Sequence, residues 1–254
     1  MPGLIKHNFN AVVQGYEYLP PTKPGYKILT RRDDGLMIID KSSGLLTVPG
    51  KPSPNSSTSD CLLSRINTDL GSEWRNVHRL DRDTSGCVLF ARGGMMGEAS
   101  RCFMRKSERV KNGDYGEGDD VMKRYVAKVH GRVERGGGRI DVPIGKEAVM
   151  SPDGRTFNRW ALGEGMEKAR VAVTDFEVIE RDEGGDWTLV ECVPLTGRGH
   201  QLRLHLASIG HPIIGDELHG REGDEAERLL LHAEMLSIRI NGELIEAHSP
   251  APFA

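Results

Sequence analysis

The sequence lacks long apolar runs and has few cysteines, and both shortages exclude classes of protein. Its longest apolar run, residues 87–91, is far shorter than the roughly 20 residues that a membrane-spanning helix needs. Residues 1–15 lack the basic start and apolar segment of a secretion signal. The four cysteines lie too far apart for a C-x-x-C metal or redox pair. We expect reduced thiols, no membrane contact and a cytoplasmic location, with an organelle as the alternative in a eukaryote.

An excess of one charge is also missing. The chain has 34 basic and 37 acidic side chains in 254 residues, a formal charge of −3, so any nucleic-acid site must be a local patch. Aromatic residues make up 6% of the chain, whereas glycine occurs 31 times. This composition predicts many tight turns and a core of aliphatic side chains.

Short strand candidates follow one another with few helices between them. They are residues 36–40, 45–48, 87–91, 125–129, 171–179, 188–193 and 235–240. Turn pairs such as Ser43-Gly44 and Asn241-Gly242 separate them. Because few crossover helices intervene, antiparallel pairing is favoured over a doubly wound parallel sheet.

Two segments have helical spacing. Residues 62–70 carry apolar side chains at helical intervals after a polar cluster at 56–60 that offers N-cap oxygens. Residues 200–209 fit both a strand and a helix, and the following Gly210 and Pro212 favour a helix.

The remaining segments are expected to be irregular. Little apolar periodicity occurs between residues 95 and 122, which predicts an acidic surface loop with an insertion at about 107–121. Residues 1–25 contain three closely spaced prolines and are interpreted as an N-terminal arm or extension. The folded domain is therefore expected to cover residues 26–254.

The densest polar cluster, residues 78–86, lies directly before an apolar run. Asp81, Asp83 and Thr84 fit the Asp-x-Asp-x-Thr pattern of magnesium-dependent phosphatases with an aspartate nucleophile. That pattern should follow an apolar parallel strand, whereas here the apolar strand comes after it. The alternative interpretation of this cluster is a reaction that uses one carboxylate and no metal.

Residues 78–86, H-R-L-D-R-D-T-S-G, resemble the H-R-L-D-x-x-T-S-G signature of the RluA family of RNA pseudouridine synthases. Further segments resemble the later family motifs in family order: residues 123–131, 196–206 with 210–216, and 228–233. Residues 43–50 and 231–236 are most similar to the subgroup that modifies both large-subunit rRNA and the tRNA anticodon arm. The resemblance spans roughly residues 28–253.

The resemblance implies an α+β pseudouridine-synthase fold, with a mainly antiparallel mixed sheet and flanking helices and loops around a central RNA-binding cleft. The reaction breaks the C1′–N1 bond of uridine and joins C1′ to C5 without a change of redox state. It therefore needs no cofactor, and we expect no metal. Three histidines, His200, His205 and His211, are spaced five and six residues apart, which does not place them on one helical face.

The family implies three catalytic residues. Asp81 is the essential carboxylate, acting as nucleophile or base, and the sequence does not separate these routes. Arg203 is the arginine that keeps this carboxylate ionised and aimed. Tyr125 stacks on the uracil or handles the C5 proton.

The family also implies an RNA-binding set. The target base must leave its stack to reach an enclosed carboxylate. Arg79 enters the RNA beside the flipped nucleotide, Leu231 packs against the base, and Arg82 and His200 complete the set. Two positions depart from the family: Gly199 replaces serine or threonine, and His219 replaces tyrosine.

The expected activity is therefore RNA pseudouridine synthesis on an rRNA and/or tRNA stem-loop, by an isomerase expected to be a monomer. The alternative is a catalytically inactive RNA-binding or RNA-folding factor of the same fold. Loss of Asp81, Tyr125 or Arg203 would favour that alternative, and all three are present. A local basic patch on an acidic surface also predicts that RNA affinity falls steeply as salt rises.

Overall fold

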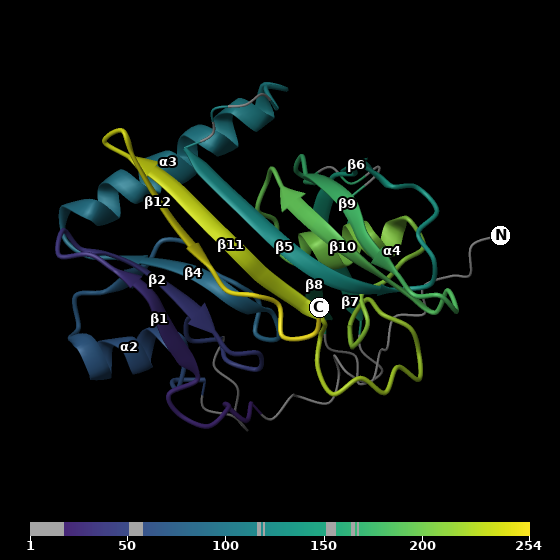
Figure 1. The fold of residues 1–254 in the computed structure, drawn as a ribbon, viewed down its shortest axis with the longest axis horizontal. Helices are drawn as coiled ribbons and strands as arrows, with labels where there is room; N and C mark the ends of the chain where they lie inside the picture. The colour runs from purple at the N-terminus through teal and green to yellow at the C-terminus, as the bar shows by residue number, and fades with distance from the viewer. Residues whose placement is uncertain are drawn as a thin grey trace. The chain divides into compact units, whose positions relative to one another are not determined.

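The computed structural model describes residues 18–50, 58–115, 118, 120–150, 156–163, 166 and 168–254. Among these residues, backbone contacts define two compact units. We name them the Asp81 unit (residues 18–126 and 231–254) and the Arg203 unit (residues 127–230). The chain passes from the first to the second within strand β5 (Val121–His130), shown in Figure 1. Within the described ranges, no helix is long and apolar enough to cross a membrane.

The Asp81 unit is built on a mixed sheet with the strand order β1-β2-β4-β11-β5. Its other strands have the bounds β1 (Tyr26–Arg31), β2 (Leu36–Lys41), β4 (Ser85–Ala91) and β11 (Leu231–Ile240). Strands β3 (Arg75–Asn76) and β12 (Glu243–His248) pair antiparallel with β4 and β11, whereas β4 and β11 pair in parallel. All seven residues of β4 are buried, which explains its continuous apolar sequence.

Helix α3 (Gly94–Lys111) corrects the prediction of a surface loop that begins at residue 95, and the insertion at about 107–121 stays a prediction. Its buried residues, Ala99, Cys102, Lys106 and Val110, recur three or four positions apart and form one face. Lys106 is buried, and its Nζ donates to the carbonyl of Val121 at 2.8 Å. Because this face contains alanine, cysteine and lysine, apolar periodicity did not reveal it.

Helix α2 (Leu62–Leu70) confirms the predicted helix, but the preceding strand prediction is wrong. Residues 45–48 form no strand, because their backbone acceptors bond to the start of α2. The amide of Leu62 donates to the carbonyl of Leu46 at 2.8 Å, and the amide of Leu63 to the carbonyl of Thr47 at 3.1 Å. The N-cap of α2 is Cys61, which lies beyond the predicted cluster at 56–60. Of that cluster, residues 56 and 57 lie outside the described residues.

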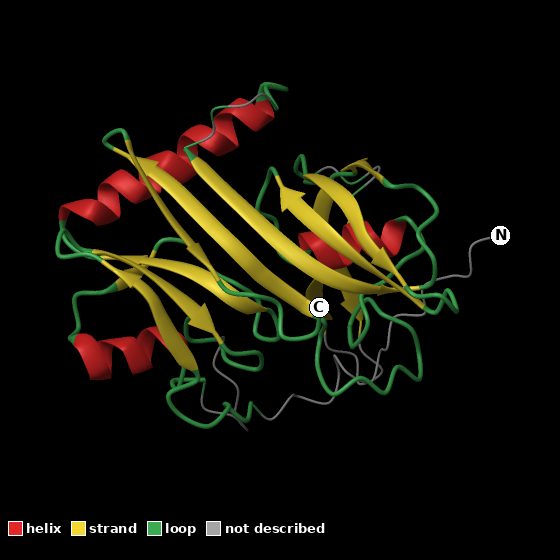
Figure 2. Ribbon diagram, in the orientation of Figure 1, coloured by secondary structure: helices red, strands yellow, loops and turns green. Residues whose placement is uncertain are grey.

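The Arg203 unit contains the strand order β5-β10-β9-β6, in which β9 pairs antiparallel with both β10 and β6. The bounds are β6 (Gly137–Asp141), β9 (Val173–Arg181) and β10 (Trp187–Pro194). A separate hairpin joins β7 (Ile144–Met150) and β8 (Thr156–Leu162), and the predicted second helix is α4 (Gln201–Ser208). Figure 2 shows strands as the dominant element, as expected for the predicted antiparallel α+β class.

Candidate active site

Asp81 lies in the turn before β4, and the backbone directly after it is fixed by side chains from residues 41–47, which we call the cradle segment. Lys41 is fully buried, and its Nζ donates to the carbonyls of Arg82 at 2.9 Å and Leu45 at 2.7 Å. Ser43 Oγ donates to the carbonyl of Asp83 at 2.7 Å. These bonds hold the two residues that follow Asp81 without using its carboxylate.

The backbone before Asp81 is held by the same segment. The buried Thr47 Oγ1 donates to the carbonyl of Leu80 at 2.8 Å and accepts from the amide of Leu80 at 3.2 Å. The Asp81 turn is thus clamped on both sides. The sequence alone indicates no role for these cradle residues, although residues 43–50 are part of the family resemblance.

The start of β4 is locked to β11. Ser85 Oγ lies 2.7 Å from His232 Nδ1, and His232 Nε2 lies 2.8 Å from the carbonyl of Ser249. Because a carbonyl only accepts, Nε2 carries the proton and Nδ1 accepts from the Ser85 hydroxyl. Gly86 has a φ of +107°, and a Cβ there would lie 2.3 Å from the carbonyl oxygen of Ala233, so this register requires glycine.

Tyr125 and Asp81 are brought together within the Asp81 unit. Tyr125 lies on β5 and is 8% exposed, whereas Asp81 is partly exposed. Burial raises the pKa of the Tyr125 phenol, and the charges of Asp81 and Cys87 raise it further. Tyr125 therefore remains protonated at neutral pH. Leu231, at the start of β11 in the same unit, is also buried.

The two arginines of the turn differ in their surroundings. Arg79 is exposed, which leaves its guanidinium accessible to solvent. Arg82 pairs with Asp83 through two contacts, Nε to Oδ1 at 2.7 Å and Nη2 to Oδ2 at 3.0 Å. Asp83, which the sequence analysis left without a site role, is therefore a counter-ion of Arg82.

His78, the first residue of the signature, has a structural function. Its Nε2 accepts from the amide of Leu89 at 3.0 Å, and its ring stacks on Phe103 with centroids 5.3 Å apart. Burial, followed by the nearby charge of Lys123, lowers the pKa of His78 to about 3. This neutral imidazole joins the beginning of the turn to β4.

In the Arg203 unit, Arg203 of α4 forms a buried two-point ion pair with Asp216. Nε lies 2.8 Å from Oδ2 and Nη2 lies 2.5 Å from Oδ1, with side-chain exposures of 4% and 0%. Burial alone would raise the pKa of Asp216, but the bonds to Arg203 outweigh it and lower the pKa to about 2. Asp216 closed the third sequence motif, yet the sequence analysis did not identify its role.

His200 and His219 contact each other. His200 is the N-cap of α4 with a left-handed φ of 55°, and its Nδ1 lies 2.9 Å from Nε2 of His219. The other two histidines of the set at positions 200, 205 and 211 have separate partners. His205 bonds to Thr174 Oγ1, and His211 bonds to the carbonyl of His130. No cluster able to hold a metal ion is found in the part of the chain that the structure describes.

Gly199 departs from the family because Trp160 occupies the space of its missing side chain. A Cβ at position 199 would lie 2.3 Å from Cε2 and Nε1 of Trp160. Trp160, on β8, also packs against Ile144, Ala172 and Leu204 of α4. Glycine at 199 and tryptophan at 160 are therefore matched in volume.

Comparison with known proteins identifies the family. A sequence model of RNA pseudouridylate synthase matches residues 35–208, more than half of the chain. The dual-specificity RNA pseudouridine synthase RluA of Vibrio vulnificus (strain CMCP6) is 34% identical over 227 residues, covering 87% of this chain and 80% of the relative. The RluA of Escherichia coli (strain K12) is 32% identical over 240 residues, covering 93% and 98%.

A solved structure agrees with these relatives. The human RNA pseudouridylate synthase domain containing 1 superposes with a TM-score of 0.70 at 27% identity, covering 93% of this chain and 87% of that chain. The predicted pseudouridine-synthase fold and isomerase activity are thereby confirmed. The chain belongs to the RNA pseudouridylate synthase family and isomerises uridine to pseudouridine in RNA.

Proposed function

We propose that this pseudouridine synthase modifies specific uridines in large-subunit rRNA and/or the tRNA anticodon arm, with Asp81 as its essential carboxylate. The observation that carries the proposal is the turn of Asp81, a partly exposed residue whose neighbouring backbone is clamped on both sides. The substrate classes follow from the dual-specificity relatives, which are 32–34% identical over most of this chain.

Asp81 initiates the reaction by attacking the sugar or base as a nucleophile, or by removing a proton from the sugar. The uracil then detaches from C1′, rotates and rejoins C1′ through C5, and any bond formed to Asp81 breaks again. C5 loses a proton and N1 gains one, so no net proton is exchanged. No electron is gained or lost, so these steps require no redox cofactor.

Tyr125 and Leu231 hold the extruded uracil in this proposal. The raised pKa of Tyr125 favours stacking by a neutral phenol over proton removal by a phenolate. Leu231 is 3% exposed and supplies an aliphatic surface for the other side of the base. A base flipped out of an RNA stack is commonly read by such aromatic and apolar contacts.

The cationic residues divide between chemistry and RNA binding. Arg203 is the catalytic arginine that the family resemblance implies, and Asp216 fixes the orientation of its guanidinium. Arg79 is exposed and enters the gap left by the flipped nucleotide. Arg82 contacts the RNA backbone from the same turn, and His200 shapes the RNA-facing start of α4.

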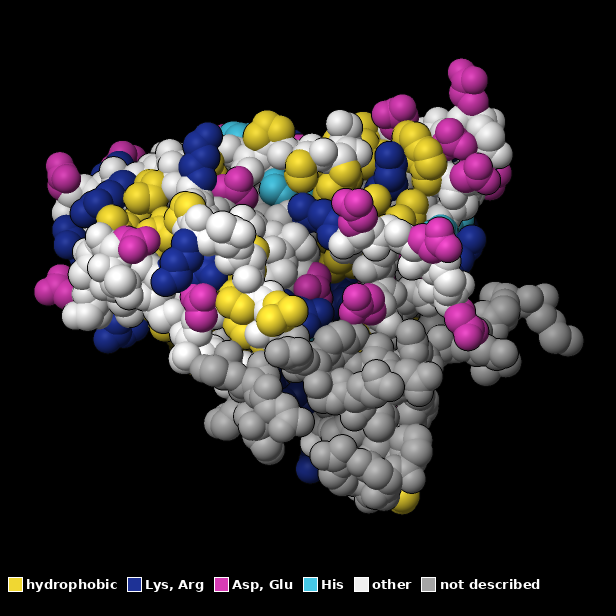
Figure 3. Space-filling model, turned by 90° about the horizontal axis from the view of Figure 1, so that it is seen from below, with side chains coloured by type: hydrophobic (Ala, Val, Ile, Leu, Met, Phe, Trp, Pro, Cys, Tyr) yellow, Lys and Arg dark blue, Asp and Glu magenta, His cyan; other side chains and the backbone are white. Residues whose placement is uncertain are grey.

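The organisation of the chain is also proposed. Residues 26–254 form the catalytic domain, residues 1–25 form an extension whose described part, from residue 18, belongs to the Asp81 unit, and the enzyme acts as a monomer in the cytoplasm. On the face shown in Figure 3, cationic side chains are interspersed with acidic ones. The proposed contacts of Arg79 and Arg82 with RNA predict an RNA affinity that decreases steeply with salt.

Tritium release tests the substrate assignment, because pseudouridine formation removes the hydrogen at uracil C5. Large-subunit rRNA, tRNA and small-subunit rRNA, each labelled with tritium at uracil C5, are incubated separately with the protein. We expect release from large-subunit rRNA, tRNA or both, and none from small-subunit rRNA. Release from small-subunit rRNA alone would overturn the assignment.

A further inference from the structure

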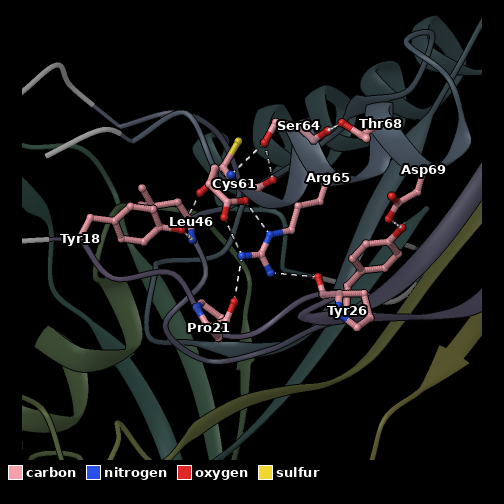
Figure 4. A network of polar contacts seen from close by, with 11 residues as sticks. Tyr18, Pro21, Tyr26, Leu46, Cys61, Ser64, Arg65, Thr68 and Asp69 are labelled. Atoms are coloured by element: carbon pink, nitrogen blue, oxygen red, sulfur yellow. Dashed lines mark hydrogen bonds and ion pairs between the residues drawn. The ribbon is translucent and has the colours of Figure 1, made fainter.

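Tyr18 lies in the segment interpreted from the sequence as an arm, yet it is only 8% exposed. Its hydroxyl both donates and accepts a hydrogen bond. Its Oη donates to the carbonyl of Asp60 at 2.8 Å and accepts from the amide of Leu46 at 3.2 Å. Figure 4 shows the phenol between the cradle segment and the residues that precede α2. One side chain therefore joins three segments that are distant in sequence.

Arg65 fixes the chain around Tyr18. Its side chain is 4% exposed and forms a two-point ion pair with Asp60, at 2.6 and 2.9 Å. The same guanidinium donates to the carbonyls of Pro21 at 2.9 Å and Pro24 at 3.0 Å, as part of the network in Figure 4. Residues 18–24 are consequently a bound part of the Asp81 unit.

A short path of hydrogen bonds leads from Tyr18 to the turn of Asp81. Leu46, which donates to Tyr18, is followed directly by Thr47. Thr47 Oγ1 in turn makes both bonds to the backbone of Leu80, the neighbour of Asp81. Because residues 45–48 belong to no strand, no sheet ladder fixes this path, and individual bonds to Tyr18, Lys41 and α2 determine where it lies.

We propose that Tyr18 is a positioning residue for pseudouridine synthesis, holding the cradle segment in the place that aims the Asp81 carboxylate. This inference rests on the proposed catalytic role of Asp81. Removal of the Tyr18 hydroxyl leaves the amide of Leu46 without this acceptor and frees Thr47 to move relative to Leu80. Small displacements of a reacting group reduce turnover more than they reduce substrate binding.

The test compares Tyr18→Phe with Tyr26→Phe in the full-length protein. Tyr26 is the matched control, because its hydroxyl donates to Asp69 Oδ2 of α2 at 2.6 Å, near the opposite end of the helix from the residues that bond to Tyr18. We expect Tyr18→Phe to lower kcat by on the order of tenfold with KM nearly unchanged. Tyr26→Phe is expected to leave both constants near their wild-type values.

Hydrogen–deuterium exchange provides a readout that is independent of catalysis. In Tyr18→Phe we expect faster exchange in residues 45–48 and 80–83, including the Leu80 amide that donates to Thr47. Tyr26→Phe should leave exchange in both segments unchanged. Unchanged exchange at 80–83 in Tyr18→Phe would overturn the proposal, as would wild-type kcat or an effect on KM alone.

The two proposals fail in different ways. If Asp81→Asn retained full turnover, the catalytic role of Asp81 would be wrong, whatever Tyr18→Phe does. If Asp81→Asn were inactive while Tyr18→Phe retained wild-type kcat and exchange, only the positioning role of Tyr18 would be wrong.

Discussion

The Asp81 unit and the Arg203 unit hold their candidate catalytic side chains by different means. Around Asp81, hydrogen bonds from Lys41, Ser43 and Thr47 hold the neighbouring backbone, and Asp81 is a partly exposed residue. Around Arg203 the side chain itself is buried and fixed by Asp216. The position of Asp81 is thus set through the backbone of its neighbours, whereas the orientation of Arg203 is set directly by its counter-ion.

The largest effect on stability is expected in the Arg203 unit, from Asp216→Asn. This change leaves the buried Arg203 guanidinium without its anionic partner, which costs about 3–5 kcal/mol. Urea unfolding at neutral pH measures this loss, because Asp216, with its pKa of about 2, is fully ionised there. The double change Arg203→Met with Asp216→Leu is the control and should recover much of the stability without activity. A loss below about 1 kcal/mol in the single variant would contradict the difference between the units.

Lys41→Met gives the corresponding effect in the Asp81 unit. Methionine retains most of the volume but leaves the carbonyls of Leu45 and Arg82 without their donor, at a cost of about 2 kcal/mol. The midpoint temperature of thermal unfolding and the rate of tritium release should both decrease. Lys27→Met, at an exposed position on β1, is the matched control. If the two variants were equally stable, Lys41 would not clamp the turn.

Gly199→Ser should cost about 1–3 kcal/mol from overpacking against Trp160. Serine restores a side chain at this position but collides with the indole ring. Trp160→Leu in the same protein should relieve the collision, so the double variant should be more stable than the sum of the two single losses predicts. Strict additivity in urea unfolding would show that the two residues are not matched in volume.

The positions of Asp81 and Arg203 could be predicted from the sequence, but the residues that hold them in place could not. The signature around Asp81 and the third motif around Arg203 could be identified because each is contiguous in sequence. Asp216, Lys41 and Thr47 were not assigned because their roles arise from contacts between segments that are separated along the chain. The order of residue types along the chain does not indicate which carbonyl a buried lysine contacts.

The fold shows the same division. Strongly apolar segments such as β2 and β4 were predicted, and so was α2 with its regular leucine and isoleucine spacing. Helix α3 was missed because Lys106 is buried through a bond to Val121, and strand β6 because it begins with glycines. The strand predicted at 45–48 was wrong because the carbonyls of Leu46 and Thr47 accept hydrogen bonds from the first amides of α2.

The central claim is tested most directly by comparing tritium release by Asp81→Asn and Asp83→Asn with that of the wild type. The two variants remove one carboxylate each from the same turn, and Asp83 is the one paired with Arg82. We predict no detectable release by Asp81→Asn and nearly wild-type release by Asp83→Asn, with both proteins folded by circular dichroism. Full release by Asp81→Asn would contradict the account.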